Sequence, residues 1–93
     1  MICRLRVKIE VGDIMLISDA VAKRISLICE ERNISINKLA LMSGLTQSTL
    51  QSIISGKSKN PKLLTIVRIC ESLEMELKDF FDIEIFEKID SEL

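Results

Sequence analysis

The chain has 93 residues, of which 47% are hydrophobic, and its formal net charge at pH 7 is -1. This length supports one small domain with a single core and argues against a second domain, while no apolar stretch reaches the roughly 18 residues of an ordinary membrane span. Aromatic residues make up only 3% and Gly and Pro are few, so aliphatic side chains must build the core, which favours helices over a turn-rich β-sandwich.

The N-terminal segment, residues 4–11, alternates polar and apolar side chains and predicts a β-strand with Leu5, Val7, Ile9 and Val11 on one face. Residues 11–13 predict a turn, after which residues 14–17 can return as a second strand. An isolated hairpin is marginal in water, so a further strand, for example from a second copy of the chain, is implied. The alternative is a flexible leader in which the alternation arises by chance.

Residues 18–32 show helical periodicity and predict the first helix. The hydroxyl of Ser18 is expected to cap its N-terminus, and Asn33 suits the left-handed conformation that ends a helix. Apolar side chains recur at helical spacing and are expected to enter the core: Val21, Ala22, Ile25, Ile28 and Cys29.

Two short helical patterns meet at a glycine in the middle of the chain. The first covers residues 36–43, with Ser35 as its expected N-cap, and ends at Gly44. The second covers about residues 47–55, with Thr46 as its N-cap. Its apolar stripe is Leu50, Ile53 and Ile54, and the opposite face is polar but uncharged: Gln47, Ser48, Gln51, Ser52 and Ser55.

A basic loop over residues 57–62 follows, and Pro61 disfavours a helical residue before it. A fourth helix is predicted to begin close to Lys62, with an apolar stripe of Leu63, Ile66, Val67, Cys70 and Leu73. Leu77, Phe80 and Phe81 predict a short fifth helix. Beyond residue 82 the pattern fits a strand and a helix equally well.

The charge distribution is uneven. Residues 1–70 carry eleven Lys or Arg against five Asp or Glu, whereas residues 71–93 carry two against nine. No acidic residue lies between Arg32 and Cys70, an interval that holds six basic residues. A polyanion would therefore be attracted to one part of the molecule and repelled from the other.

A short helix with an apolar inner face and a neutral amide and hydroxyl outer face fits the DNA major groove, which is about 12 Å wide. There Gln can form a bidentate pair with adenine, and Ser and Thr serve as small donors and acceptors. Gly44 permits the positive φ of a tight corner, and Ala40 leaves room for the two helices to approach.

Taken in order, these residues resemble the Cro/C1-type (Xre-like) helix-turn-helix family of phage repressors and bacterial regulators. The resemblance covers about residues 18–82 and rests on short motifs: Leu39-Ala40, Gly44-Leu45, Thr46-Gln47, Leu50 with Ile53, Gly56-Lys57, Pro61, and Leu77 with Phe80-Phe81. It implies an all-α fold, a five-helix lambda-repressor-like bundle over residues 18–82. A short N-terminal β-strand or hairpin extension (residues 1–17), which is a candidate dimerisation strand, and an acidic C-terminal tail (residues 83–93) would flank it.

The resemblance also implies roles for individual residues. Base contacts are expected from Gln47, Ser48 and Ser52, with Gln51 and Thr49 nearby, and phosphate contacts from Thr46, Lys57, Lys59 and Asn60. The family often has Gln as the first residue of the second helix, where this chain has Ile36. Asn37 is therefore expected to take part of that phosphate-binding role, unless anchoring at this corner is weaker. The alternative for all these side chains is a merely solvated surface.

The sequence therefore predicts a sequence-specific regulator of transcription, a repressor that binds double-stranded DNA as a homodimer in the cytoplasm and needs no cofactor. The alternative is a protein-interaction module, such as an antitoxin-like partner, that uses the acidic, apolar tail. An enzyme is not expected, because the chain has no His, no Gly-rich phosphate loop and no paired metal ligands. The cysteines, Cys3, Cys29 and Cys70, are interpreted as small hydrophobic residues.

Overall fold

The computed structural model describes residues 16–58 and 60–89, and this part of the chain is entirely helical apart from its connections. Its elements are α1 (Ile17–Arg32), α2 (Ile36–Ser43), α3 (Gln47–Ile54), α4 (Leu63–Ser72), α5 (Leu77–Phe81) and the 3-10 helix η3 (Glu84–Lys88). This confirms the predicted all-α, five-helix fold. The predicted N-terminal strand or hairpin lies outside the described residues. None of the described helices has the length and apolar character needed to cross a membrane.

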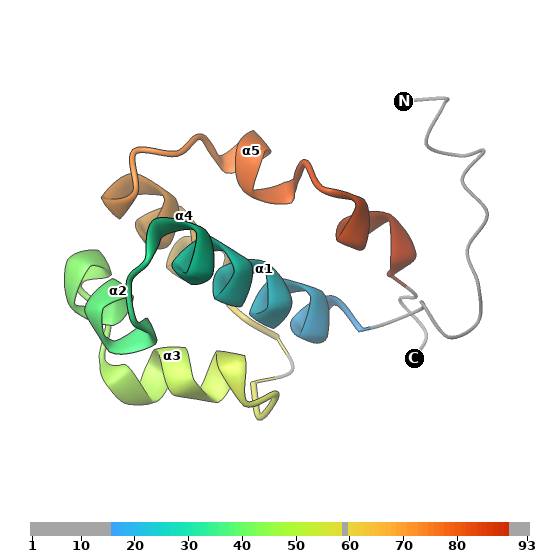
Figure 1. The fold of residues 1–93 in the computed structure, drawn as a ribbon. Helices are drawn as coiled ribbons and strands as arrows, with labels where there is room; N and C mark the ends of the chain where they lie inside the picture. The colour runs from blue at the N-terminus through green and yellow to red at the C-terminus, as the bar shows by residue number, and fades with distance from the viewer. Residues whose placement is uncertain (1–15, 59, 90–93) are drawn as a thin grey trace.

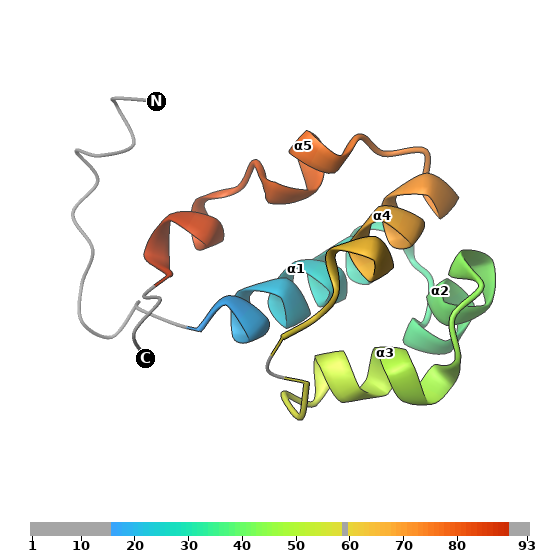
Figure 2. The ribbon, with the colours of Figure 1, turned by 180° about the vertical axis from the view of Figure 1, so that it is seen from behind.

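The longest helix, α1, lies in the middle of the bundle and packs against α2, α3 and η3. Helix α2 packs against both α3 and α4, and α4 in turn packs against α5. In both views of the ribbon α3 and α5 lie at opposite ends of the molecule, with α1 between them (Figures 1 and 2). Helix α3 is therefore at the edge of the bundle, where its outer side is open to a ligand.

Local capping chemistry sets the bounds of the short helices. The Ser35 hydroxyl accepts a hydrogen bond from the backbone N–H of Lys38 at 3.0 Å, and so begins α2. Asn33, with φ 58°, ends α1 in the left-handed conformation. Gly44, with φ 69°, ends α2 in the same way. These three predictions are confirmed.

The predicted cap of the first helix is wrong. Helix α1 begins at Ile17, its N-cap is Leu16, and no side chain caps it. Ser18 is consequently the second residue of the helix and faces the core, where it is 1% exposed. Its hydroxyl has no hydrogen-bond partner among the described residues. The sequence signal failed because a serine near a helix start can enter the first turn instead of preceding it.

The core is formed by aliphatic side chains from α1 to α4, closed by Phe80 of α5. The predicted stripe of α4 is partly wrong: Leu63 is 59% exposed, whereas Ile69 is fully buried. Helix α4 is apolar on more than one side, so two different sets of positions fit a helical stripe. The side of α4 that faces α2 carries Ile66, Ile69 and Cys70 into the core.

The described residues after α5 fold back along α1 and form the 3-10 helix η3, in place of the α-helix or extended strand that the pattern allowed. Phe86 of η3 is partly buried and packs against the core. The ring centroids of Phe81 and Phe86 are 4.9 Å apart in an edge-to-face arrangement, and those of Phe80 and Phe81 are 5.0 Å apart. The three Phe side chains thus hold η3 against the bundle.

Candidate nucleic-acid interface

The corner between α2 and α3 is closed by backbone hydrogen bonds. The N–H of Leu45 donates to the carbonyl of Ala40 at 2.9 Å, and the N–H of Gly44 donates to Leu41 at 3.3 Å. A Cβ atom on Gly44 would meet no atom within 4 Å, so its positive φ and not a lack of space favours glycine. Ala40 is buried on the inner side of α2, as the sequence predicted. These residues fix the direction in which α3 leaves the corner.

Thr46 caps α3, as predicted. Its hydroxyl accepts a hydrogen bond from the backbone N–H of Thr49 at 3.1 Å, and the two threonine hydroxyls lie 2.8 Å apart. Thr49 thereby holds the cap in position. The first backbone N–H groups of a helix have no acceptor within the helix, so those of Gln47 and Ser48 are available to an anion at this end.

The outer side of α3 is polar and carries no charge. Gln47, Ser48, Thr49 and Gln51 are exposed and Ser52 is half-buried, while Leu50 is buried on the opposite side. With eight residues the helix is about 12 Å long, which suits insertion into the DNA major groove. The predicted base-contacting residues therefore all lie on one accessible helix.

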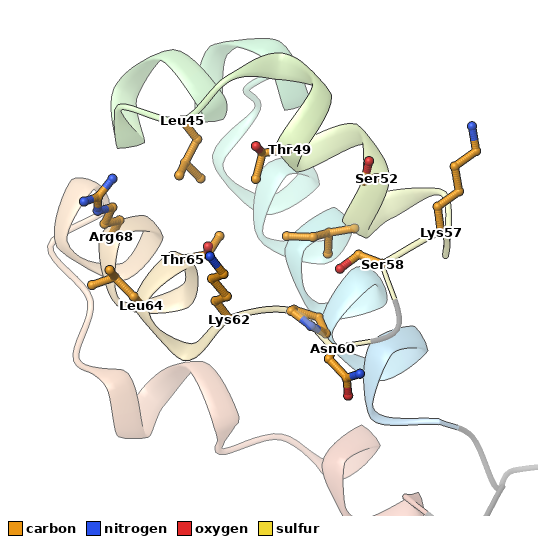
Figure 3. Close-up of a pocket in the computed structure, with 12 residues that line it drawn as sticks. Leu45, Thr49, Ser52, Lys57, Ser58, Asn60, Lys62, Leu64, Thr65 and Arg68 are labelled. Atoms are coloured by element: carbon orange, nitrogen blue, oxygen red, sulfur yellow. The ribbon is translucent and has the colours of Figure 1, made fainter.

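An open groove of about 670 Å³ separates α3 from α4 (Figure 3). Thr49 and Ser52 line it from α3, so they lie on the side of the helix that faces α4. Gln47, Ser48 and Gln51 are not among the residues that line the groove. The structure thus divides the five predicted base-contacting residues into two sets.

The groove is basic. Its lining includes the cationic side chains of Lys57, Lys62 and Arg68, and none of the described residues that line it is acidic. The remaining lining is apolar or hydroxyl-bearing: Leu45, Ile53, Ser58, Pro61, Leu64 and Thr65, with the amide of Asn60 at one end. Sequence reasoning did not assign Lys62 and Arg68 to the site. The absence of acidic residues between positions 32 and 70 was the available signal.

The predicted phosphate-contacting residues do not form one cluster. Lys57 and Asn60 are exposed and line the groove together, while Asn37 is exposed on the first turn of α2, away from it. Lys59 lies outside the described residues. Ile36, where a polar residue was expected, is half-buried and packs against the core, so this position serves packing.

Not every basic residue of the acid-free interval is available to a ligand. The Arg32 guanidinium donates from Nη1 to the carbonyl of Leu73 at 3.1 Å, at the end of α4. Such a contact stabilises a helix C-terminus, where backbone carbonyls are otherwise unpaired. By contrast, the side chains of Lys57, Lys62 and Arg68 make no hydrogen bond or ion pair with the described residues. Three of the four basic side chains that are free of such contacts in the described part of this interval therefore line the groove, and the fourth, Lys38, lies on α2.

The described residues form no group of three or more His, Cys, Asp or Glu side chains that could hold a metal ion. Cys29 and Cys70 are free thiols within the hydrophobic core. Burial raises the pKa of both thiols above the ordinary value of 9.0, and the charge of Arg24 offsets part of the effect at Cys70. These cysteines serve as core residues, as the sequence predicted.

Comparison with known proteins agrees with this geometry. Residues 24–84 match the family profile of the Cro/C1-type HTH DNA-binding domain. The chain is also 35% identical over 71 residues to the HTH-type transcriptional regulator SlrR of Bacillus subtilis (strain 168). That alignment covers 74% of this chain and 47% of the relative, so the chain spans about half the length of the curated relative. No solved structure gives a significant match.

Proposed function

The chain belongs to the Cro/C1-type helix-turn-helix DNA-binding family, and from this premise we propose that it is a sequence-specific transcriptional repressor. The observation that carries the proposal is the uncharged polar side of α3 beside a groove lined by cations and no described acid. Neutral amides and hydroxyls suit base edges, whereas lysine and arginine suit phosphates. Both kinds of side chain lie at the same exposed end of the bundle.

In this mechanism α3 enters the major groove. Gln47, Ser48 and Gln51 contact base edges directly, and Ser52 contributes from the side that faces α4. Thr46, at the helix start, donates its hydroxyl hydrogen to a phosphate oxygen together with the free backbone N–H groups of the first turn. The lysines and asparagines hold the phosphate backbone and supply affinity without sequence preference: Lys57, Lys59, Asn60 and Asn37.

One short helix contacts few base pairs, so useful specificity needs a second one. We propose a homodimer that places two α3 helices about 34 Å apart on a palindromic site. The proposed dimerisation elements are residues 1–17 and 83–93, at the two ends of the chain; within the second segment, η3 also packs against α1. A mass measurement in solution on the full chain and on one lacking residues 1–14 tests this, because monomers in both cases would exclude pairing through the N-terminal segment.

The function is tested by measuring binding to a pool of random duplex fragments at several salt concentrations. Gln47→Ala should relax the preference at one base position, because it removes a bidentate pair but no charge. Lys57→Ala should weaken binding to all sequences alike and reduce the salt slope by about 0.9. Lys78→Ala is the matched control, since Lys78 is also exposed but lies on α5, at the opposite end of the bundle.

The results separate the two parts of the proposal. If the wild-type chain binds no DNA at low salt, the function is wrong. If it binds but Gln47→Ala keeps the same sequence preference, then α3 does not contact the bases as proposed.

A protein-interaction module remains the second candidate. The half-buried side chains of Ile83, Ile85 and Ile89 favour it, because they leave apolar surface beside acidic residues in the tail. Phe86, the largest apolar residue of that segment, is already packed against the bundle's own core. The DNA-binding proposal therefore ranks first. Co-purification of a stable protein complex that binds no DNA would reverse this order.

A further inference from the structure

We propose that the outer side of α1 is an interface with a second copy of the chain, in which the two α1 helices pair in antiparallel directions. The contact surface consists of Lys23, Ser26, Leu27 and Glu30, which form the α1 face. The inference rests on the proposed homodimer and deepens it, because it adds a surface of the bundle itself to the two chain ends.

The α1 face is open to solvent. Helix α1 lies in front of α4 in Figure 1 and behind it in Figure 2, and all four residues of the α1 face are exposed. Positions 23, 27 and 30 are separated by four and three residues, so they lie on one side of the helix. Leu27, in the middle of this row, is 40% exposed. Covering this leucine would stabilise a complex through the hydrophobic effect.

Further apolar side chains lie beside the α1 face. A groove of about 360 Å³ is lined by the whole α1 face and by the half-buried Ile54 at the end of α3. A second groove of about 490 Å³ shares residues of α1 with the first and extends to the half-buried Ile36 of α2. Ile36, where a polar residue was expected, therefore lengthens the apolar surface along α1. A second helix laid against α1 would remove part of this surface from water.

The charges of the α1 face match those of a second copy. Lys23 and Glu30 are about 10.5 Å apart along the helix, and neither side chain makes a hydrogen bond or ion pair with the described residues. In an antiparallel pair centred between Ser26 and Leu27, Lys23 of each copy lies opposite the partner's Glu30. Both opposite-charge pairs then form together, and the two leucines meet at the centre. A parallel pair in register would instead place like charges together.

Two other acidic residues of α1 lie near the α1 face. Asp19 precedes Lys23 by one turn, but its Oδ1 atom lies 3.9 Å from the position that a Cβ atom on Gly56 would take, toward the loop after α3. Glu31 is exposed next to Glu30, at the end of the contact where the partner's Lys23 would lie. The contact thus keeps a base at one end and acids at the other.

The symmetry of such a pair suits DNA binding. A two-fold axis that relates two antiparallel helices is perpendicular to both helices and to the line that joins them. Helices α3 and α5 lie on opposite sides of α1, whose outer side faces the viewer in Figure 1. The axis therefore runs from the α5 side to the α3 side. Both copies of α3 then lie at the same end of the dimer, as a palindromic site requires.

The test is the mass of the full chain in solution, measured without DNA by sedimentation equilibrium at rising protein concentration. The wild type should form a dimer. Lys23→Glu places acid opposite acid at both ends of the contact, and Glu30→Lys places base opposite base. Each change should weaken dimerisation by about 10-fold or more at low salt, and less at high salt. Lys78→Glu, at an exposed position of α5, is the control and should leave the dimer unchanged.

A mixture of the two variants tests the antiparallel pairing itself. In an equimolar mixture of the Lys23→Glu and Glu30→Lys chains every contact again joins opposite charges, so a mixed dimer should form with about the wild-type affinity. The double variant Lys23→Glu/Glu30→Lys should also pair with itself. Damage to the fold would not be repaired in this way. Below the concentration at which dimers form, all variants should unfold at the same urea concentration as the wild type, because these side chains are exposed.

A wild-type chain that stays monomeric up to about 1 mM would overturn the inference. Charge variants that dimerise as well as the wild type, or a mixture that forms no mixed dimer, would also overturn it. The chain ends would then remain the proposed interface if removal of residues 1–14 abolished the dimer. The proposed function is assessed separately, because DNA binding and the effect of Gln47→Ala on base preference are measured on chains with an unchanged α1 face.

Discussion

Arg24 of α1 holds the C-terminal end of α5 through Phe80. Its Nε donates to the Phe80 carbonyl at 2.7 Å, its Nη2 donates to the Asp79 carbonyl at 2.8 Å, and its guanidinium carbon lies 5.7 Å from the centroid of the Phe80 ring. The same arginine thus pairs carbonyls at a helix end and makes a cation–π contact with the aromatic residue that closes the core. The positive charge of Arg24 therefore interacts with groups of the bundle itself.

Arg24→Met should destabilise the fold by about 2 kcal/mol, because it keeps the apolar stem and removes the charge-assisted hydrogen bonds. Urea unfolding of both proteins measures the difference. Lys23→Met is the matched control, since Lys23 is the exposed neighbour on the same helix and should change stability by less than about 0.5 kcal/mol. Equal losses for the two variants would show that the contact with α5 contributes nothing specific.

Ser18→Ala should increase stability by about 1 kcal/mol. The Ser18 hydroxyl is buried without a partner among the described residues, and burying an unpaired polar group is unfavourable. The sign of the effect is informative, because a capping serine would lose about 1 kcal/mol on the same change. Thermal and urea unfolding of the variant measure it, and a clear loss of stability would mean that the hydroxyl has a partner or caps the helix after all.

Ile69→Ala should destabilise the protein by about 2 to 5 kcal/mol, because it removes a fully buried side chain from the core. Leu63→Ala, on the same helix, should change stability by less than about 0.5 kcal/mol, because Leu63 is mostly exposed. Urea unfolding measures both stability changes. If the m-values of the two variants are equal, the shifts of their midpoints can be compared directly. The opposite order of effects would mean that α4 presents its other side to the core.

The two buried thiols should make stability fall at high pH. Burial raises the pKa of Cys29 and Cys70 above the ordinary value of 9.0, so above about pH 9 the thiols of the unfolded chain lose protons that the folded chain keeps. Ionisation therefore stabilises the unfolded state relative to the folded state as the pH rises, and the free energy of unfolding falls. Cys29→Ala/Cys70→Ala should show a smaller loss of stability between pH 8 and pH 10 than the wild type. Identical pH dependence would exclude this contribution.

Much of the site could be predicted because its determinants are local. Ser35, Gly44 and Thr46 act within a few residues of their own positions, so their roles follow from the types of side chain and their spacing. The neutral outer side of α3 follows in the same way from helical periodicity. The family resemblance rests on the order in which these local features follow one another along the chain.

Other features depend on contacts between distant parts of the chain, which a pattern does not reveal. Leu63 and Ile69 are equally apolar and both fit a helical stripe, so only the packing of α4 decides which one is buried. Arg24 and Arg68 are both arginines on helices, yet one binds carbonyls 55 and 56 residues away and the other lines an open groove. The total charge of a segment therefore indicates where a polyanion would be attracted but not which cations are free to bind it.

The central claim is that α3 contacts base edges, and selection of bound duplexes from a random pool tests it most directly, with the wild type and Gln47→Ala compared in parallel. The account predicts that the wild type enriches a sequence with two symmetry-related half-sites about one helical turn apart, and that Gln47→Ala relaxes the same position in each half-site. Enrichment of no sequence by the wild type, or an identical selected sequence for Gln47→Ala, would contradict it.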